Sequence, residues 1–438
     1  MKTTPPISPT ATLPDLGAER ISAERFTSTS WMEREWAHLW RRVWNMGPRE
    51  AELCAPGDFV VHAFGSESLL FVRGRDSTIR GFYNVCQHRG STLCTEQEAG
   101  RATSFRCPFH NWIYDLDGAL KHVPGAENFP LLRQGTTQGE LSLKEFAVDA
   151  WGGWVFFHLA PEPEPLRSFL GVVPEHLDPY HPSEMTLYEY KSFEWPCNWK
   201  AACDAFNETY HFRALHPQMS DWANEVAQIE LLGIHSRMVN QYGTTSPSRT
   251  GDTELGAGMK SYMRTMGMEP STYDGRPVDV RLEMQRQLRA SEDASPFPVR
   301  DLTDEQLSDV YHYTLFPNVS FNLFPAGING FRYRPHESDP QKMYYDLLLL
   351  AHFPAGEEPP SAVHRTYRLE ERVPYGEAID APVAPEVIEV LQQDADNMGR
   401  VQRGLASEGF GGLVVCDQEL RVRHFHQTVE AYLEKEPL

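Results

Sequence analysis

The sequence predicts an α+β protein with two domains, a small all-β domain followed by a larger domain in which an antiparallel sheet packs against helices. The chain has 438 residues, which is too long for one ordinary core. From Gly57 to His158 the apolar residues gather in short β-rich runs separated by turn-forming segments. Beyond the acidic segment Pro161–Pro165, which resembles a stiff linker, strand patterns and helical patterns occur together.

We expect four consecutive segments. Residues 1–20 are rich in Pro and Thr and predict a flexible arm. Residues 21–46 place apolar side chains at three-to-four-residue steps and predict a helical segment that packs on the larger domain. Residues 47–160 form the expected β domain, and residues 166–438 form the expected larger domain.

Elements of the larger domain follow from local patterns. We expect a helix from Trp199 to Leu215 and a final helix from Pro385 to Leu405. The polar stretch from Thr244 to Asp301 predicts an excursion with some helix. Strands are expected at 187–195, 319–324, 330–334 and 343–353.

Composition and charge exclude some classes of function. The formal net charge of −21 argues against nucleic acid, because phosphates require a basic surface. The sequence contains no run of about 20 apolar residues, so we expect no membrane span. Seven cysteines and an N-terminus without the pattern of a signal peptide favour reduced thiols or metal ligands in a cytoplasmic protein. The five cysteines outside the motifs described below are expected to be buried free thiols: Cys54, Cys94, Cys197, Cys203 and Cys416.

A first group of candidate metal ligands lies in the β domain. Cys86 and His88 form a Cys-x-His pair, and after eighteen intervening residues Cys107 and His110 form a Cys-x-x-His pair. Two thiolates and two imidazoles suit a tetrahedral zinc or a Rieske cluster. A single Cys or His of this kind is more often a packed core residue, but zinc fingers favour Cys-x₂₋₄-Cys pairs over this spacing.

A second group lies on the expected helix of the larger domain. Glu208 and His211 are three residues apart and share a helix face, whereas His211 and His216 are five apart. A break near Pro217 would bring both imidazoles to one metal. Two histidines and one carboxylate form the facial triad of non-heme iron enzymes, so a carboxylate from elsewhere is required.

Both cysteine–histidine segments resemble the ligand loops of Rieske oxygenases over their full length. The segments are Cys86-Gln-His-Arg-Gly90 and Cys107-Pro-Phe-His-Asn-Trp-Ile-Tyr-Asp-Leu-Asp-Gly118. The resemblance to ring-hydroxylating oxygenase alpha subunits implies a Rieske [2Fe-2S] domain in which Cys86 and Cys107 hold one iron and His88 and His110 the other. It also implies a helix-grip (START/SRPBCC-like) catalytic domain.

The same resemblance assigns roles in the catalytic domain. His211, His216 and Asp394 are the implied ligands of a mononuclear Fe(II), and Asp396 is the rival carboxylate. Glu208 is the implied electron-transfer bridge between His211 and a Rieske histidine of a neighbouring subunit. Further positions that we consider, each as readily structural as functional, are Asp204, Tyr210 and the pocket-wall candidates Phe206, Leu215, Met219, Phe321, Leu323 and Phe331.

The resemblance implies a terminal oxygenase component that uses O₂ and electrons from NADH to hydroxylate an aromatic or other apolar substrate. A flavin reductase, a ferredoxin or both would supply the electrons, since the sequence lacks a Gly-x-Gly-x-x-Gly fingerprint. A homotrimer is expected, and a small β subunit is possible. The alternatives are N-demethylation of a quaternary ammonium compound, a Rieske electron carrier and a lipid-type ligand binder.

Overall fold

The computed structural model describes residues 13–94 and 99–435 and divides the chain into two compact units. The smaller unit contains Glu35–Phe169, and the larger unit contains the described residues up to Arg34 together with Leu170–Lys435. The expected N-terminal arm falls outside the described residues as far as position 12. None of the helices in the described part of the chain has the length and apolarity that a membrane crossing requires.

The expected helical segment at 21–46 is divided between the units. It forms α1 (Glu24–Thr27), α2 (Thr29–Arg34) and a π-helical turn, η1 (Glu35–Trp40). Phe26 packs against His426 of the larger unit, whereas Trp36 and Trp40 pack edge-on against Phe64 of the smaller unit. The described residues up to Arg34 therefore belong to the larger unit, and the residues from Glu35 onward belong to the smaller one.

The smaller unit is an all-β structure. In its described residues, seven strands form an antiparallel sheet in the order β1-β10-β9-β4-β3-β2-β5, and three short strands form a second sheet, β6-β7-β8. Their bounds are β1 Asn45–Arg49, β2 Asp58–Phe64, β3 Glu67–Arg73, β4 Ile79–Tyr83, β5 Ala99–Arg101, β6 Phe105–Arg106, β7 Ile113–Tyr114, β8 Leu120–His122, β9 Glu145–Trp151 and β10 Trp154–His158. Cys86 and Cys107 lie within the apolar core that joins these sheets.

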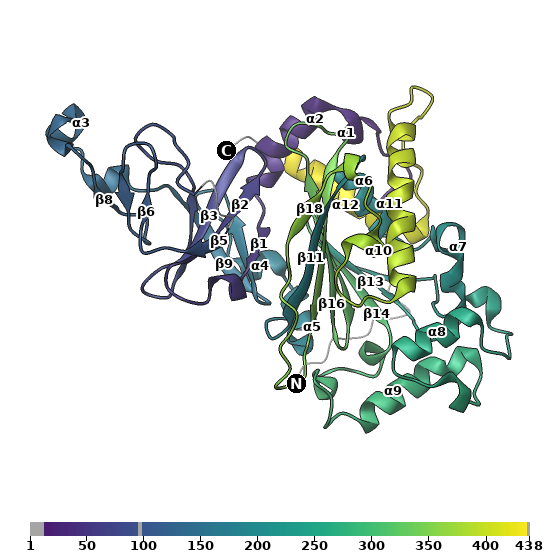
Figure 1. Ribbon diagram of the computed structural model, residues 1–438. Helices are drawn as coiled ribbons and strands as arrows, with labels where there is room; N and C mark the ends of the chain where they lie inside the picture. Colours follow the sequence, from purple (N-terminus) through teal and green to yellow (C-terminus); the bar gives the residue numbers. More distant parts are fainter. Residues whose placement is uncertain (1–12, 95–98, 436–438) are drawn as a thin grey trace. The chain divides into compact units, whose positions relative to one another are not determined.

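The larger unit contains an eight-stranded sheet in the order β12-β13-β14-β15-β16-β17-β11-β18, counted over the described residues. Neighbouring strands are antiparallel except β11 and β18. The bounds are β11 Thr186–Trp195, β12 Gln228–Leu232, β13 His235–Asn240, β14 Val310–Leu315, β15 Val319–Phe324, β16 Gly327–Pro335, β17 Met343–Ala351 and β18 Arg365–Tyr367. Figure 1 shows this sheet with helices α6, α10 and α11 beside it.

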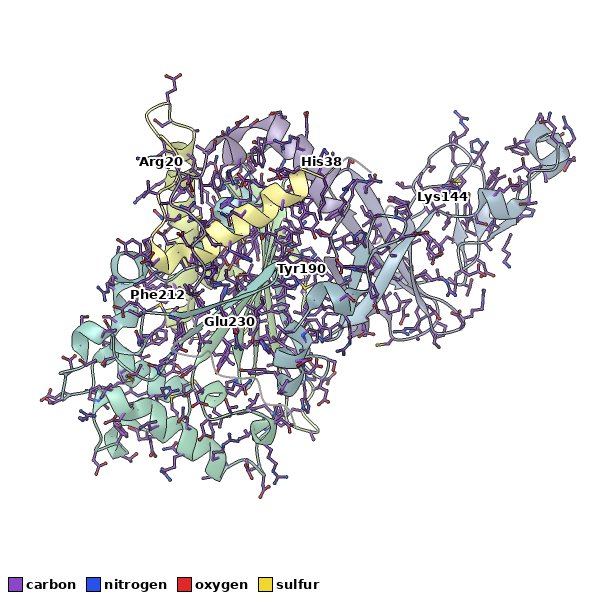
Figure 2. All side chains as sticks on the ribbon, turned by 180° about the vertical axis from the view of Figure 1, so that it is seen from behind. Arg20, His38, Lys144, Tyr190, Phe212 and Glu230 are labelled. Carbon is purple, nitrogen blue, oxygen red and sulfur yellow. The ribbon has the colours of Figure 1, made fainter. Side chains whose placement is uncertain are left out.

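Helices α7 and α11 of the larger unit position the candidate iron ligands, since Asp394 lies on α11 and His211 and His216 flank α7. Besides α1 and α2, the helices of this unit include α5 Val173–Leu177, α6 Trp199–Phe206, α7 Phe212–Leu215, α8 Ala257–Thr265, α9 Val280–Ala290, α10 Tyr375–Ala378, α11 Pro385–Leu405 and α12 Leu420–Leu433. The expected helix at 385–405 is confirmed with Pro385 at its first turn, where a missing N–H does no harm. It is not the last helix, because α12 follows and lies across the strands in Figure 2.

The helix expected from Trp199 to Leu215 is interrupted, so that prediction is wrong. Asn198 caps the start of α6 by accepting the N–H of Lys200, and α6 ends at Phe206. The chain leaves the helical path at Asn207 and re-enters it at Phe212. A second interruption at His216 precedes Pro217, as expected for a residue that precedes proline.

Candidate metal centres in the two units

Two loops of the smaller unit hold Cys86 and Cys107 in matching backbone conformations. The carbonyl of Cys86 accepts the N–H of Gly90, and the carbonyl of Cys107 accepts the N–H of Asn111, both at 3.0 Å. Gly90 and Asn111 have φ values of +75° and +61°, the left-handed region that glycine and asparagine tolerate best. The two loops are therefore closed by the same turn, four residues after each cysteine.

The four candidate ligands of the smaller unit come together. The thiol groups of Cys86 and Cys107 are in hydrogen-bonding contact, and the ring centroids of His88 and His110 are 4.5 Å apart. Nδ1 of each imidazole is buried and has no hydrogen-bond partner among the described residues. Because a buried polar atom without a partner is costly, two such nitrogens beside two thiols fit the donor set of a Rieske cluster.

The surroundings of the thiols affect their protonation differently. Burial raises the pKa of the Cys86 thiol, although Tyr114 opposes this through a hydroxyl 3.4 Å from Sγ. Burial also acts to raise the pKa of Cys107, but the backbone N–H groups of His110 and Phe109 donate to its sulfur, and the net pKa is lowered. Hydrogen bonds to the charged form favour a thiolate, the form that binds iron.

Helix α11 presents Asp394 to the interior of the larger unit. The buried residues of this helix recur at three-to-four-residue steps and include Leu391, Asp394 and Met398. Asp396 lies two residues farther along, on an exposed side of the helix, where it accepts a hydrogen bond from Gln392. The inward stripe of α11 therefore contains Asp394 and excludes Asp396.

Asp394 meets the two histidines that follow α6. Its Oδ1 is 3.1 Å from Nε2 of His216 and 3.9 Å from Nε2 of His211. One donor atom from each of the three residues lies within 4.8 Å of the others, an arrangement that could hold a metal ion. Two imidazoles and one carboxylate fit the facial triad of a non-heme iron site.

The opposite nitrogen of each histidine is held by another side chain. Nδ1 of His211 is 2.6 Å from Oε1 of Glu208, and Nδ1 of His216 is 2.6 Å from Oε1 of Gln393. Such contacts fix the ring orientation and place the proton on Nδ1, which leaves the Nε2 lone pair for a metal. Burial acts to lower the pKa of His211, but the hydrogen bond and charge of Glu208 and the charge of Asp394 raise it overall.

Comparison with known proteins identifies the family. Residues 182–435 match the model of the ring hydroxylating alpha subunit (catalytic domain), and residues 43–145 match the Rieske [2Fe-2S] domain. The chain belongs to the ring-hydroxylating alpha-subunit family. The fold class predicted from the sequence, a Rieske domain followed by an α+β catalytic domain, is thereby confirmed.

Curated relatives of this alpha subunit fall into two groups. The glycine betaine monooxygenase oxygenase subunit of Chromohalobacter salexigens is 32% identical over 187 residues, 42% of this chain and 40% of that protein. The carnitine monooxygenase oxygenase subunit of Escherichia coli (strain K12) is 30% identical over 235 residues, 52% of this chain and 60% of that protein. The biphenyl 2,3-dioxygenase subunit alpha of Rhodococcus jostii is 31% identical over 209 residues, 46% of this chain and 44% of that protein. The matches thus span 40% to 60% of these relatives' own lengths.

Solved structures share the fold at low sequence identity. The quaternary ammonium Rieske monooxygenase CntA with L-carnitine aligns with a TM-score of 0.67 and 18% identity over 97% of this chain and 100% of that chain. Naphthalene 1,2-dioxygenase from Rhodococcus sp. bound to indole aligns with a TM-score of 0.64 and 18% identity over 95% of each. Both alignments extend across the Rieske and catalytic parts of the alpha subunit.

Some pocket-wall candidates lie away from the iron ligands. Phe206 packs against Phe331 on the sheet face that α6 covers. Phe321 and Leu323 point to the opposite face, because Ser320, not Phe321, is the register partner of Phe331. Met219 belongs to a methionine-rich cluster that packs against Phe212, and Leu215 lies on α7, directly before His216. The strand β15 was predicted correctly, but sequence alone did not show which of its faces meets the helices.

The burial or the contacts of several residues could not be predicted from the sequence. Asp204 is largely buried and contacts His426 of α12 at 2.9 Å, whereas Tyr210 is 62% exposed. Cys54 and Cys416 are exposed, contrary to the prediction of buried thiols. Residues whose site contacts we had not predicted are Gln393, Tyr114 and Arg421. Gln393 directly precedes Asp394, and this adjacency was the one sequence signal that could have suggested its role.

Proposed function

We propose that this chain is the terminal oxygenase component of a system that uses O₂ and electrons from NADH to oxidise a small organic substrate. The observation that carries the proposal is the His211–His216–Asp394 cluster, whose donor atoms lie within 4.8 Å of one another in a chain that also has a Rieske domain. An electron carrier needs only the Rieske ligands, and a lipid binder needs neither set. The two sets together therefore favour an oxygenase.

We assign the metal-binding roles to residues of this chain. Cys86, Cys107, His88 and His110 would hold the [2Fe-2S] cluster, and His211, His216 and Asp394 would hold a mononuclear Fe(II). A bound Fe(II) with open positions would supply O₂ activation, while the cluster would supply stored electrons. Glu208 and Gln393 keep the Nδ1 protons of the two histidines in place and so direct both Nε2 atoms toward Asp394.

Electron delivery requires partners in this proposal. A flavin reductase, a ferredoxin or both would pass electrons from NADH. Glu208 would act as the electron-transfer bridge, with His211 on one side and a Rieske histidine of a neighbouring subunit on the other. This role requires a neighbouring subunit, and a homotrimer, with or without a small β subunit, would supply one because a cyclic head-to-tail interface closes on itself.

The surroundings of the histidines favour an aromatic or other apolar substrate. The Phe212 ring packs edge-on against His211 and His216, with ring centroids 5.1 Å and 5.6 Å apart. Phe212 also packs against a methionine-rich cluster formed by Met219, Trp222, Ala223, Met259, Met263, Met268, Val280 and Met284. Methionine side chains adapt to irregular apolar shapes, which suits binding of a hydrocarbon surface.

Oxidative N-demethylation of a quaternary ammonium compound is the second candidate. Glu208 occupies a position at which most ring-dihydroxylating members have Asp, and relatives named for glycine betaine and carnitine match this chain. Aromatic rings can also hold a quaternary ammonium by cation–π contacts. These features give the second candidate support of its own.

Metal content and products test the proposal. An oxygenase is expected to contain about three irons per chain, a carrier about two and a ligand binder none. Reduced protein with ¹⁸O₂ should be incubated with biphenyl, benzene, glycine betaine and L-carnitine. Two labelled oxygens in one aromatic product would support dihydroxylation, one would support monooxygenation, and formaldehyde would support demethylation. Two irons per chain with no oxidised product would overturn the proposal.

A further inference from the structure

Arg421 of α12 is a buried cation whose described partners are all uncharged. Its side chain is fully buried, and its guanidinium contacts Ser236 Oγ at 3.0 Å, His312 Nδ1 at 3.1 Å, Thr314 Oγ1 at 2.7 Å and the carbonyl oxygen of Asn207 at 3.4 Å. Burial lowers the pKa of Arg421 to about 9, which still leaves it protonated at neutral pH. A buried charge with no counter-ion among the described residues is costly, so these hydrogen bonds must offset that cost.

The hydrogen bonds of Arg421 converge on Asn207. Arg421 donates to Thr314 Oγ1, and the Thr314 hydroxyl donates to Asn207 Oδ1 at 2.6 Å. The Asn207 amide contacts Cys203 Sγ at 3.4 Å, and its backbone N–H donates to the carbonyl of Asp204 at 3.0 Å. Together with the Arg421 contact, every polar group of Asn207 is engaged.

Asn207 is the residue at which α6 ends and the site segment begins. Glu208 is the next residue, and His211 follows three positions later. On the far side of the interruption, the Thr209 hydroxyl donates to the carbonyl of Glu225 at 2.6 Å. The short segment that carries the bridge and the first histidine is thus anchored at two points by residues outside it.

We propose that Arg421 and Thr314 are positioning residues that end α6 at Asn207 and thereby direct Glu208 and His211 toward the metal site. We call Asn207, Thr314 and Arg421 the Asn207 clamp. The inference rests on the proposed function, because it gives the clamp a role in aligning the proposed iron ligands. Neither Arg421 nor Thr314 contacts a ligand directly, so each acts through Asn207.

Two substitutions test the clamp, one at each of the two residues that act on Asn207. Thr314→Val removes the hydroxyl relay and keeps the β-branched shape, and Arg421→Lys keeps the charge but not the fork of donors. Arg423→Met is the matched control, since Arg423 is a buried arginine of the same helix that donates to the carbonyl of Glu19 instead. All variants are made in the full-length chain.

The first measurement needs no metal. In metal-free protein, hydrogen–deuterium exchange of the amides of 207–212 is expected to accelerate on the order of tenfold in Thr314→Val and Arg421→Lys, because local opening becomes easier. Arg423→Met should leave this segment at the wild-type rate. The second measurement records the paramagnetic resonance spectrum of the ferrous site with nitric oxide as the probe, and we expect a changed signal shape in both clamp variants but not in the control.

Each outcome decides the inference. Faster exchange together with an altered nitrosyl spectrum supports the clamp, and a turnover loss of about tenfold to a hundredfold on a substrate that the wild type converts would accompany it. Unchanged exchange, or faster exchange with a wild-type nitrosyl spectrum, overturns it. A wild-type protein that binds no ferrous iron would instead overturn the proposed function.

Discussion

Nδ1 of His211 lies 2.6 Å from Oε1 of Glu208, while Nε2 of the same ring faces Oδ1 of Asp394 at 3.9 Å. One imidazole therefore lies between two carboxylates with different tasks. Glu208 also accepts the backbone N–H of His211 at 3.1 Å, so it holds both the ring and the main chain of this residue. A carboxylate that orients an imidazole in this way tunes the metal site without binding the metal.

We expect Glu208→Gln to lower turnover about tenfold to a hundredfold while the protein keeps its mononuclear iron. The amide retains an oxygen that can accept the Nδ1 proton of His211 but loses the negative charge. Iron content and the rate of product formation would be measured together. Glu419→Gln is the control. Glu419 lies near Glu208, but its carboxylate accepts the backbone N–H of Cys416 and does not hydrogen-bond a histidine among the described residues. Full activity of Glu208→Gln would contradict the bridging role.

The choice of carboxylate on α11 can be tested by paired substitutions. Asp394→Ala should reduce the iron content from about three to about two atoms per chain, because the mononuclear site loses one of three ligands. Asp396→Ala should keep the wild-type content, since Asp396 is exposed and bonded to Gln392. Metal analysis of the two purified variants distinguishes them, and equal iron contents would refute the assignment of Asp394.

The cluster ligands have a control in the same loop. Cys86→Ser should abolish the visible absorption and the reduced-state paramagnetic spectrum of a Rieske cluster, because a hydroxyl is a poor substitute for a thiolate. Cys94→Ser should leave both spectra intact. Burial raises the pKa of Cys94 to about 11, which keeps it a neutral thiol away from metal chemistry. A Rieske spectrum that survives in Cys86→Ser would exclude this residue as a ligand.

Asp346 should make stability dependent on pH in acid. This fully buried carboxylate lies between Arg332 and Arg334, each with a nitrogen 2.7 Å from Oδ2. Burial acts to raise its pKa, but the two guanidinium groups outweigh burial and lower it far below the usual value. The ionised form therefore stabilises the fold above about pH 4, the ordinary carboxyl pKa, and this contribution is lost as the pH falls below it.

The corresponding substitution gives a stability difference that can be measured. Asp346→Asn should lower the free energy of unfolding by about 3–5 kcal/mol at pH 7, since it removes the carboxylate that the guanidinium groups of Arg332 and Arg334 share. The difference from wild type should shrink below about pH 4. Urea unfolding at several pH values tests this, with Asp380→Asn as a surface control, because Asp380 is 77% exposed beside Lys191. A difference independent of pH would show that the charge of Asp346 is not responsible.

The sequence by itself determined the type of each domain and indicated which donor groups the two candidate metal sites contain. The Cys-x-His and Cys-x-x-His pairs, the two histidines after α6 and the helix Pro385–Leu405 were visible as local patterns. The acidic segment of α11 was assigned only through the resemblance to ring-hydroxylating oxygenases. Local patterns suffice there because residue type sets metal preference and because helix periodicity depends only on neighbours a few positions apart.

Only the tertiary structure decided how these residues meet. The end of α6 at Asn207 depends on Thr314 and Arg421, which lie 107 and 214 positions farther along the chain. Asp394 rather than Asp396 approaches His216 because the buried stripe of α11 fixes the rotation of that helix. Phe321 points away from Phe206 because strand register determines the face on which a side chain lies. Contacts between distant segments set each of these features, and no local pattern specifies them.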